Sequence, residues 1–191
     1  MALDPKFNKF STTSPVLMNF DYADILSGTG IIDFYLAVGV YGGSSKHLIV
    51  QNVVSSASTQ EDQSVVGSVF ELSPFNRSQT IRGTITFQCY IASTNPVPTI
   101  TLLFQKDSGG VKTTVGTTTL LAFDSAKGFL GQIEITEGIN FKKGDFLCLT
   151  ISKSNAAATY IGTDPTNLVG THLAAGQTKT TLSIPFDLPN Q

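Results

Sequence analysis

Residues 80–91, TIRGTITFQCYI, alternate between two kinds of side chain. One set is mostly apolar and comprises Ile81, Gly83, Ile85, Phe87, Cys89 and Ile91. The other set is polar or amphipathic and comprises Arg82, Thr84, Thr86, Gln88 and Tyr90. Because successive side chains on a β-strand point to opposite faces, this stretch predicts a long strand with one buried face. We expect it to be the central strand of an antiparallel fold.

The rest of the chain repeats the pattern in shorter runs separated by Gly, Pro, Asn and Asp. Further strands are expected within residues 31–38, 46–54, 65–72, 99–106, 111–123, 129–136, 141–151, 156–162 and 180–188. No stretch predicts a helix. Eight to ten strands with turn signals between them indicate an all-β, two-sheet antiparallel β-sandwich, and the strand number favours a jelly-roll-like one.

Several local features add detail to this expectation. Residues 107–110, DSGG, predict a hairpin turn between two strands. Residues 55–63 predict a polar loop, and in the run that follows Val66, Ser68 and Phe70 are expected on one face. Pro185 predicts either an edge strand or a bulge, because proline cannot donate a ladder hydrogen bond.

The two cysteines, Cys89 and Cys148, each lie among residues that alternate into a core. We expect buried free thiols, since two cysteines make neither a disulfide scaffold nor a zinc site.

Composition limits the classes of function. The chain has 191 residues, which suits a single domain, and only 14% of them are charged, against about 25% in a typical protein. Either a Thr/Ser/Asn surface hydrates without charge, or neighbouring subunits cover much of it. The net charge of −2 and the scattered Lys and Arg argue against nucleic-acid binding, and no apolar stretch is long enough to span a membrane.

Residues 1–28 differ from the rest and are expected to form an extended N-terminal arm ahead of a single sandwich domain, 29–191. Pro5 and Pro15 oppose regular strand pairing there. The arm is nevertheless rich in apolar side chains that need a partner surface: Phe7, Phe10, Val16, Leu17, Met18 and Phe20.

The sequence predicts no catalytic, cofactor-binding or metal-binding residue. His47 and His172 lie outside any nucleophile motif, and neither H-x-x-x-H nor C-x-x-C occurs. Three tyrosines near strand ends and loops, Tyr35, Tyr41 and Tyr160, are candidates for stacking on a ligand such as a sugar. A hydrolase would require a pocket that joins His172 to a carboxylate and a serine.

Several segments resemble small all-β proteins of tailed phages and environmental viruses. The residues that carry this resemblance are 21–24 (DYAD), 74–77 (PFNR), 80–84 (TIRGT), 141–145 (FKKGD), 164–167 (DPTN) and 184–188 (IPFDL). The Lys143-Gly144-Asp145 turn with its following strand is also similar to the penultimate region of trimeric C1q/TNF-like jelly rolls.

The first resemblance implies a non-enzymatic virion structural protein of the capsid-decoration, head-fibre or tail-accessory type. It would be located in the virion and need no cofactor. Its expected partners are copies of itself, with a trimer favoured, and a major capsid or other virion protein gripped by the arm. The alternative is a receptor- or carbohydrate-binding module of a phage fibre or tail.

Overall fold

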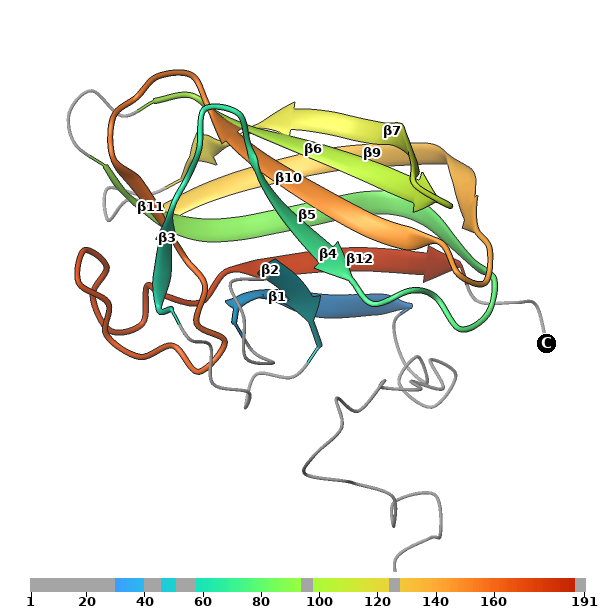
Figure 1. Cartoon of the computed structure of the whole chain (residues 1–191), viewed down its shortest axis with the longest axis horizontal. Coiled ribbons are helices and arrows are strands. Elements are labelled where there is room, and N and C mark those ends of the chain that lie inside the picture. The colour runs from blue at the N-terminus through green and yellow to red at the C-terminus, as the bar shows by residue number, and fades with distance from the viewer. Residues whose placement is uncertain (1–29, 40–45, 51–57, 94–97, 124–127, 188–191) are drawn as a thin grey trace, which may run out of the picture.

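The computed structural model describes residues 30–39, 46–50, 58–93, 98–123 and 128–187. The predicted arm, with Phe7, Phe10, Val16, Leu17, Met18 and Phe20, lies outside these residues, and so does Tyr41. Within the described part every regular element is a β-strand, which confirms the all-β prediction (Figure 1). The strands are β1 (Ile31–Val38), β2 (Lys46–Ile49), β3 (Gln60–Asp62), β4 (Ser68–Leu72), β5 (Gln79–Ser93), β6 (Ile100–Ser108), β7 (Val111–Thr119), β8 (Leu121–Ala122), β9 (Gly128–Phe141), β10 (Phe146–Lys153), β11 (Thr159–Gly162) and β12 (Thr181–Asp187).

Residues 80–91 form most of β5, which is central to the sheet as expected. Its 15 residues pair antiparallel with β9, β12 and β11. One detail differs. Gly83 was expected on the inward face, but the pairing with β9 shifts register between Ile81 and Gly83. Gly83 has a φ of 108° there and faces the ring of Pro185 across the sheet.

The strand pairing is nested. Eight strands have five or more residues: β1, β4, β5, β6, β7, β9, β10 and β12. Taken in chain order, the outermost strands pair first and the innermost last: β1 with β12, β4 with β10, β5 with β9 and β6 with β7. A long hairpin that folds back on itself produces this nested order, whereas the jelly-roll assignment stays a prediction.

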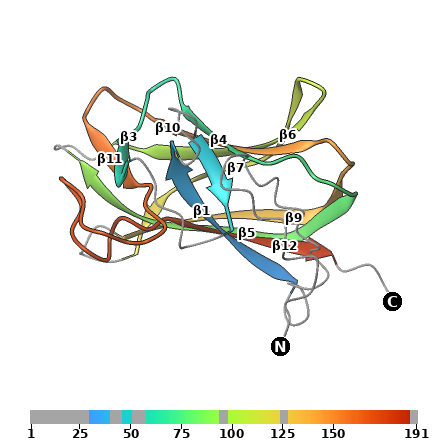
Figure 2. The same cartoon turned by 60° about the horizontal axis from the view of Figure 1, so that its bottom comes forward.

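The chain folds this sheet into two facing layers. Figure 2 shows β4, β6 and β10 in one layer above β5, β9 and β12 in the other. The layers are not separate sheets, because β1 pairs with both β12 and β2, and β2 pairs in parallel with β4. The inward side chains of both layers form one core, in which Phe34, Phe70, Phe75, Phe87, Phe104 and Phe141 are the largest fully buried residues.

Several local expectations can be compared with this fold. The hairpin at residues 107–110 is confirmed, because β6 and β7 pair across it. Pro185 marks a register shift within β12, which lies between β1 and β5, so the bulge rather than the edge strand is confirmed. Cys89 and Cys148 are confirmed as buried free thiols.

Two expectations were wrong. The predicted polar loop 55–63 contains β3, a three-residue strand that pairs with β11. Val66 was expected on the same face as Ser68 and Phe70, but it is 93% exposed whereas those two residues are buried, because Val66 precedes β4 and lies in the connection from β3.

Candidate functional site

Two of the predicted stacking residues lie on the same outer surface. Tyr35 in β1 pairs with Thr181, which pairs in turn with the exposed Gln88 of β5. Tyr160 in β11 pairs with Ala92 of β5. Ala92 lies two residues after Tyr90 and is therefore on the same face of β5 as Tyr90. Directly opposed residues point to the same side of a sheet, so both rings lie on the outer face of the layer that contains β5.

Neither ring is a bare platform. The Lys179 ammonium lies 4.5 Å from the centroid of the Tyr35 ring, a cation–π geometry. The imidazole of His172 is stacked on Tyr160, with ring centroids 3.9 Å apart and an interplanar angle of 17°. One face of each tyrosine is therefore occupied by a side chain from the segment between β11 and β12.

That segment, residues 163–180, is a long loop whose two ends meet. The hydroxyl of Thr180 donates to the carbonyl of Gly162 at 2.8 Å, and the amide of Asp164 donates to the carbonyl of Thr178 at 3.1 Å. Gly162 is required at this closure, because a Cβ there would lie 2.0 Å from the carbonyl oxygen of Thr178. We call these residues the closed loop.

The polar side chains of Asp164, which is buried, and Asn167, which is half-buried, hold the closed loop in one shape. The carboxylate of Asp164 accepts hydrogen bonds from the amides of Thr166 and Leu168. Asn167 adopts a left-handed conformation, with φ of 61°, and its side-chain oxygen accepts from the amide of Lys179 at 3.1 Å. Asn and Asp are the residues that tolerate and stabilise such turns.

A strand of the sheet ties the far end of the loop down. The side-chain oxygen of Gln60, in β3, accepts from the amides of His172 and Leu173 at 2.9 and 3.1 Å. Leu173 is buried, whereas Leu168 and Val169 are 60% and 66% exposed. Long ordered loops on a rigid sheet are common sites of binding, and this one presents two apolar side chains and an imidazole.

The sequence pattern did not predict a second feature of the outer face. Tyr90 pairs with Gly128 of β9, whose carbonyl accepts from the amide of Phe123. In the adjacent row Leu130 pairs with Gln88 on one side and with Leu121 of β8 on the other. Phe123 is 48% exposed and Leu121 71% exposed. We call Leu121, Phe123, Leu130, Tyr90 and Tyr160 the aromatic patch.

Only part of this patch was visible in the sequence. Tyr90 was correctly assigned to the outward face of its strand, but its neighbours depend on the pairing of β5 with β9 and β8. The patch carries no charge of its own. The charged pair Arg82–Asp187, with nitrogen and oxygen 3.4 Å apart, lies at the opposite end of β5.

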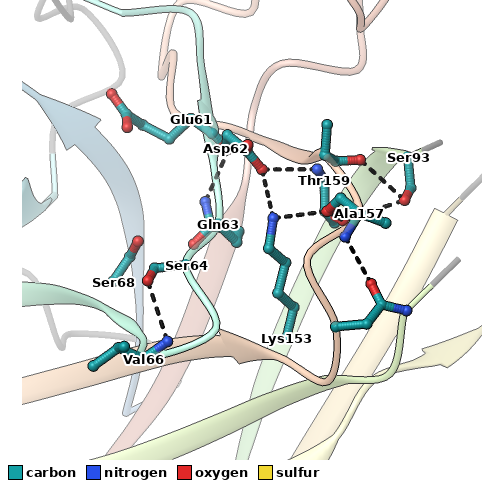
Figure 3. A network of polar contacts seen from close by, with 12 residues as sticks. Glu61, Asp62, Gln63, Ser64, Val66, Ser68, Ser93, Lys153, Ala157 and Thr159 are labelled. Carbon is teal, nitrogen blue, oxygen red and sulfur yellow. Dashed lines mark hydrogen bonds and ion pairs between the residues drawn. The ribbon is translucent and has the colours of Figure 1, made fainter.

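A buried lysine, Lys153, stabilises the region where β3, β10 and β11 meet (Figure 3). The Lys153 ammonium donates to the Asp62 carboxylate at 2.9 Å and to the carbonyl of Ala157 at 2.7 Å. The same carboxylate accepts from the amide of Thr159 at 2.8 Å. Burial alone would raise the pKa of Asp62, but the Thr159 amide and the Lys153 ammonium outweigh it and lower this pKa. The network joins β3, β10 and β11 and has a structural role.

A similar cluster closes the other end of the sandwich. Asp145 follows the turn at Lys143-Gly144 and accepts from Lys106 at 2.9 Å, from the Ser108 hydroxyl at 2.7 Å and from the Lys142 amide at 2.7 Å. Against the effect of burial, these partners lower the pKa of Asp145 to about 2. Both oxygens of the Asp145 carboxylate accept hydrogen bonds, and these contacts stabilise the turn.

Reactive side chains are dispersed in the described part of the chain. His47 lies in β2 and His172 in the closed loop, and no group of three or more His, Cys, Asp and Glu that could hold a metal ion occurs among the described residues. The described residues also include no helix of the length and apolarity needed to cross a membrane.

Comparison with known proteins adds information on the fold. No family model and no curated protein sequence matches the chain. Among solved structures, it is similar to a CocE/NonD family hydrolase from Staphylococcus aureus, with a TM-score of 0.55, 11% identity, and coverage of 84% of this chain and 37% of that one. It is also similar to an α-amino acid ester hydrolase, with a TM-score of 0.59, 10% identity, and coverage of 81% and 36%.

These neighbours correct the functional prediction. The prediction of a non-enzymatic virion structural protein, with its alternative of a receptor- or carbohydrate-binding phage module, is contradicted by these two neighbours, both of which are hydrolases. The virion location, the self-association and the capsid partner stay predictions. The chain spans little more than a third of the hydrolases it matches, and at this level of identity the likeness establishes the fold alone.

Proposed function

We propose that this chain is the β-sandwich unit of a hydrolytic enzyme. The observation that carries the proposal is the likeness of more than four fifths of the chain to about a third of two hydrolases. In this role the sandwich contributes a shaped surface, and residues outside the described part, or outside this chain, supply the reacting groups.

The closed loop is the element best suited to such a role. It is held at Gly162, where its two ends meet, and again by Gln60 at His172, so that it keeps its shape in the absence of a ligand. Its exposed Leu168 and Val169 and the stacked His172 present apolar and hydrogen-bonding groups together. A preorganised loop of this kind lowers the entropic cost of binding a substrate or of bordering an active site.

The test is to tag the protein at its natural level in its source organism, purify it natively and assay the eluate on a panel of esters and amides. The expected result is hydrolysis above that of a mock purification. In His172→Ala the KM should rise more than kcat falls, because a bordering residue contributes binding rather than chemistry.

Val66→Ser is the matched control, since Val66 is exposed but lies between β3 and β4, and it should leave both constants unchanged. An eluate that contains the intact tagged chain yet hydrolyses nothing on the panel would overturn the proposal.

A further inference from the structure

We infer that the aromatic patch is a docking surface for the N-terminal arm of the same chain, residues 7–20. This inference does not depend on the proposed hydrolytic role. It rests on a described apolar surface, on the composition of the arm and on the point at which the arm joins the sheet.

The aromatic patch consists of several adjoining side chains and not of one isolated exposed residue. Register places Leu121, Leu130 and Gln88 in one row across three strands, and Phe123, Gly128 and Tyr90 in the next. Adjacent rows on one face are about 7 Å apart along a strand and neighbouring strands about 5 Å apart, so these side chains form one continuous surface. A contiguous apolar surface of this kind is typical of an interaction site.

Among the described residues, the other exposed apolar side chains do not form such a surface. Val65 and Val66 lie together in the connection between β3 and β4, Val69 lies within β4 and is only 36% exposed, and Val111 lies at the start of β7. Leu168 and Val169 are adjacent at the tip of the closed loop. Each of these is one or two side chains, whereas the aromatic patch combines residues of β5, β8, β9 and β11.

The arm has the composition of an occupant. Its apolar side chains are Phe7, Phe10, Val16, Leu17, Met18 and Phe20, and residues 7–20 carry Lys9 as their only charged side chain. An uncharged aromatic patch and an apolar, aromatic segment are matched in the way that the centres of protein interfaces are.

The geometry lets the arm reach the patch without a second copy. The arm joins β1 at Gly30, and Ile31 is 52% exposed and opposite Pro185, at the far end of the same outer face. From there the patch lies about 20 Å across the strands and about 23 Å along them, or roughly 30 Å in a straight line. The ten residues from Phe20 to Gly30 span up to about 35 Å when extended.

Attachment in the same chain also favours this occupant over a free partner. A tethered segment has an effective concentration in the millimolar range, so a modest affinity is enough to keep it bound.

The test is hydroxyl-radical footprinting of the full chain, which reports the exposure of individual side chains. In one variant the six apolar arm residues become serine. In the matched control Ser11, Thr12, Thr13 and Ser14 become alanine, so that the arm is altered but its apolar side chains stay. Circular dichroism establishes that each variant retains the sheet.

Modification of Leu121, Phe123 and Tyr90 should increase severalfold in the serine variant and not in the control. Val66 and Val111 should react equally in all three proteins. Equal modification of Leu121 and Phe123 in the three proteins would overturn the inference, because the patch would then be bare. Protection that disappears on dilution would also overturn it, because the occupant would then be a second copy or its arm.

Discussion

Lys153 and Asp62 form an ion pair in which only the cation is deeply buried. The exposed fraction of the side chain is 5% for Lys153 and 46% for Asp62. Asp62→Ala leaves a buried ammonium with the Ala157 carbonyl as its remaining partner, and we expect a loss of about 2–3 kcal/mol in the free energy of unfolding. Lys153→Met removes the buried charge and leaves an accessible carboxylate, so its cost should stay below about 1 kcal/mol. Urea denaturation of both variants tests this order, and an equal or reversed order would contradict it.

Asp145 gives the fold a dependence on low pH. Its pKa is lowered from an ordinary value near 3.8 to about 2 by Lys106, Ser108 and the Lys142 amide, which outweigh burial. A depressed folded-state pKa contributes stability that is complete above the unfolded pKa and is lost as the pH falls through the folded pKa. Wild type should thus lose on the order of 1–2 kcal/mol through this group between about pH 4 and pH 2.

Asp145→Asn should flatten that part of the stability curve and lower stability at neutral pH. Asp187→Asn is the control, because Asp187 pairs with Arg82 at an exposed position. Equilibrium unfolding at several pH values measures both variants, and an Asp145→Asn curve parallel to that of wild type would rule this explanation out.

At the scale of elements, alternation and turn residues were sufficient for the strands of the core. β5 was predicted to within one or two residues at each end, because its inward side chains are apolar almost throughout. The strands that the sequence pattern missed are those that form only because they pair with a neighbouring strand. β3 has no apolar alternation, since it reads QED, and it exists because β11 is beside it.

The candidate site was only partly predictable for the same reason. Tyr35 and Tyr160 were named from their positions near strand ends, but their partners Lys179 and His172 come from the closed loop. No local pattern indicates that a loop of this length folds back onto the strands that flank it. Its shape depends on Gln60, more than a hundred residues earlier in the chain.

The closure of that loop is itself testable at Gly162. A methyl group there would lie 2.0 Å from a backbone oxygen of Thr178, so Gly162→Ala must displace the loop and should cost about 2 kcal/mol. Limited proteolysis should then cleave within residues 163–180 faster than in wild type. Thr180→Val removes only the hydroxyl bond to Gly162 and should have a smaller effect. Unchanged cleavage in Gly162→Ala would show that the loop is not held at this point.

At the scale of the whole molecule, the two thiols report whether both layers unfold together. Cys89 lies in β5 of one layer and Cys148 in β10 of the other, and both are buried. Burial raises the pKa of both thiols, that of Cys148 to about 11, so neither forms the reactive thiolate at neutral pH. A single core shared by two layers predicts one cooperative transition. Two single-cysteine variants test this, Cys148→Ala for Cys89 and Cys89→Ala for Cys148. In a urea titration a thiol reagent should label the remaining cysteine of each variant at the same midpoint. Each midpoint is first corrected for the stability of that variant, measured by circular dichroism. Labelling of either thiol well before loss of the β-sheet signal would show that its layer opens independently.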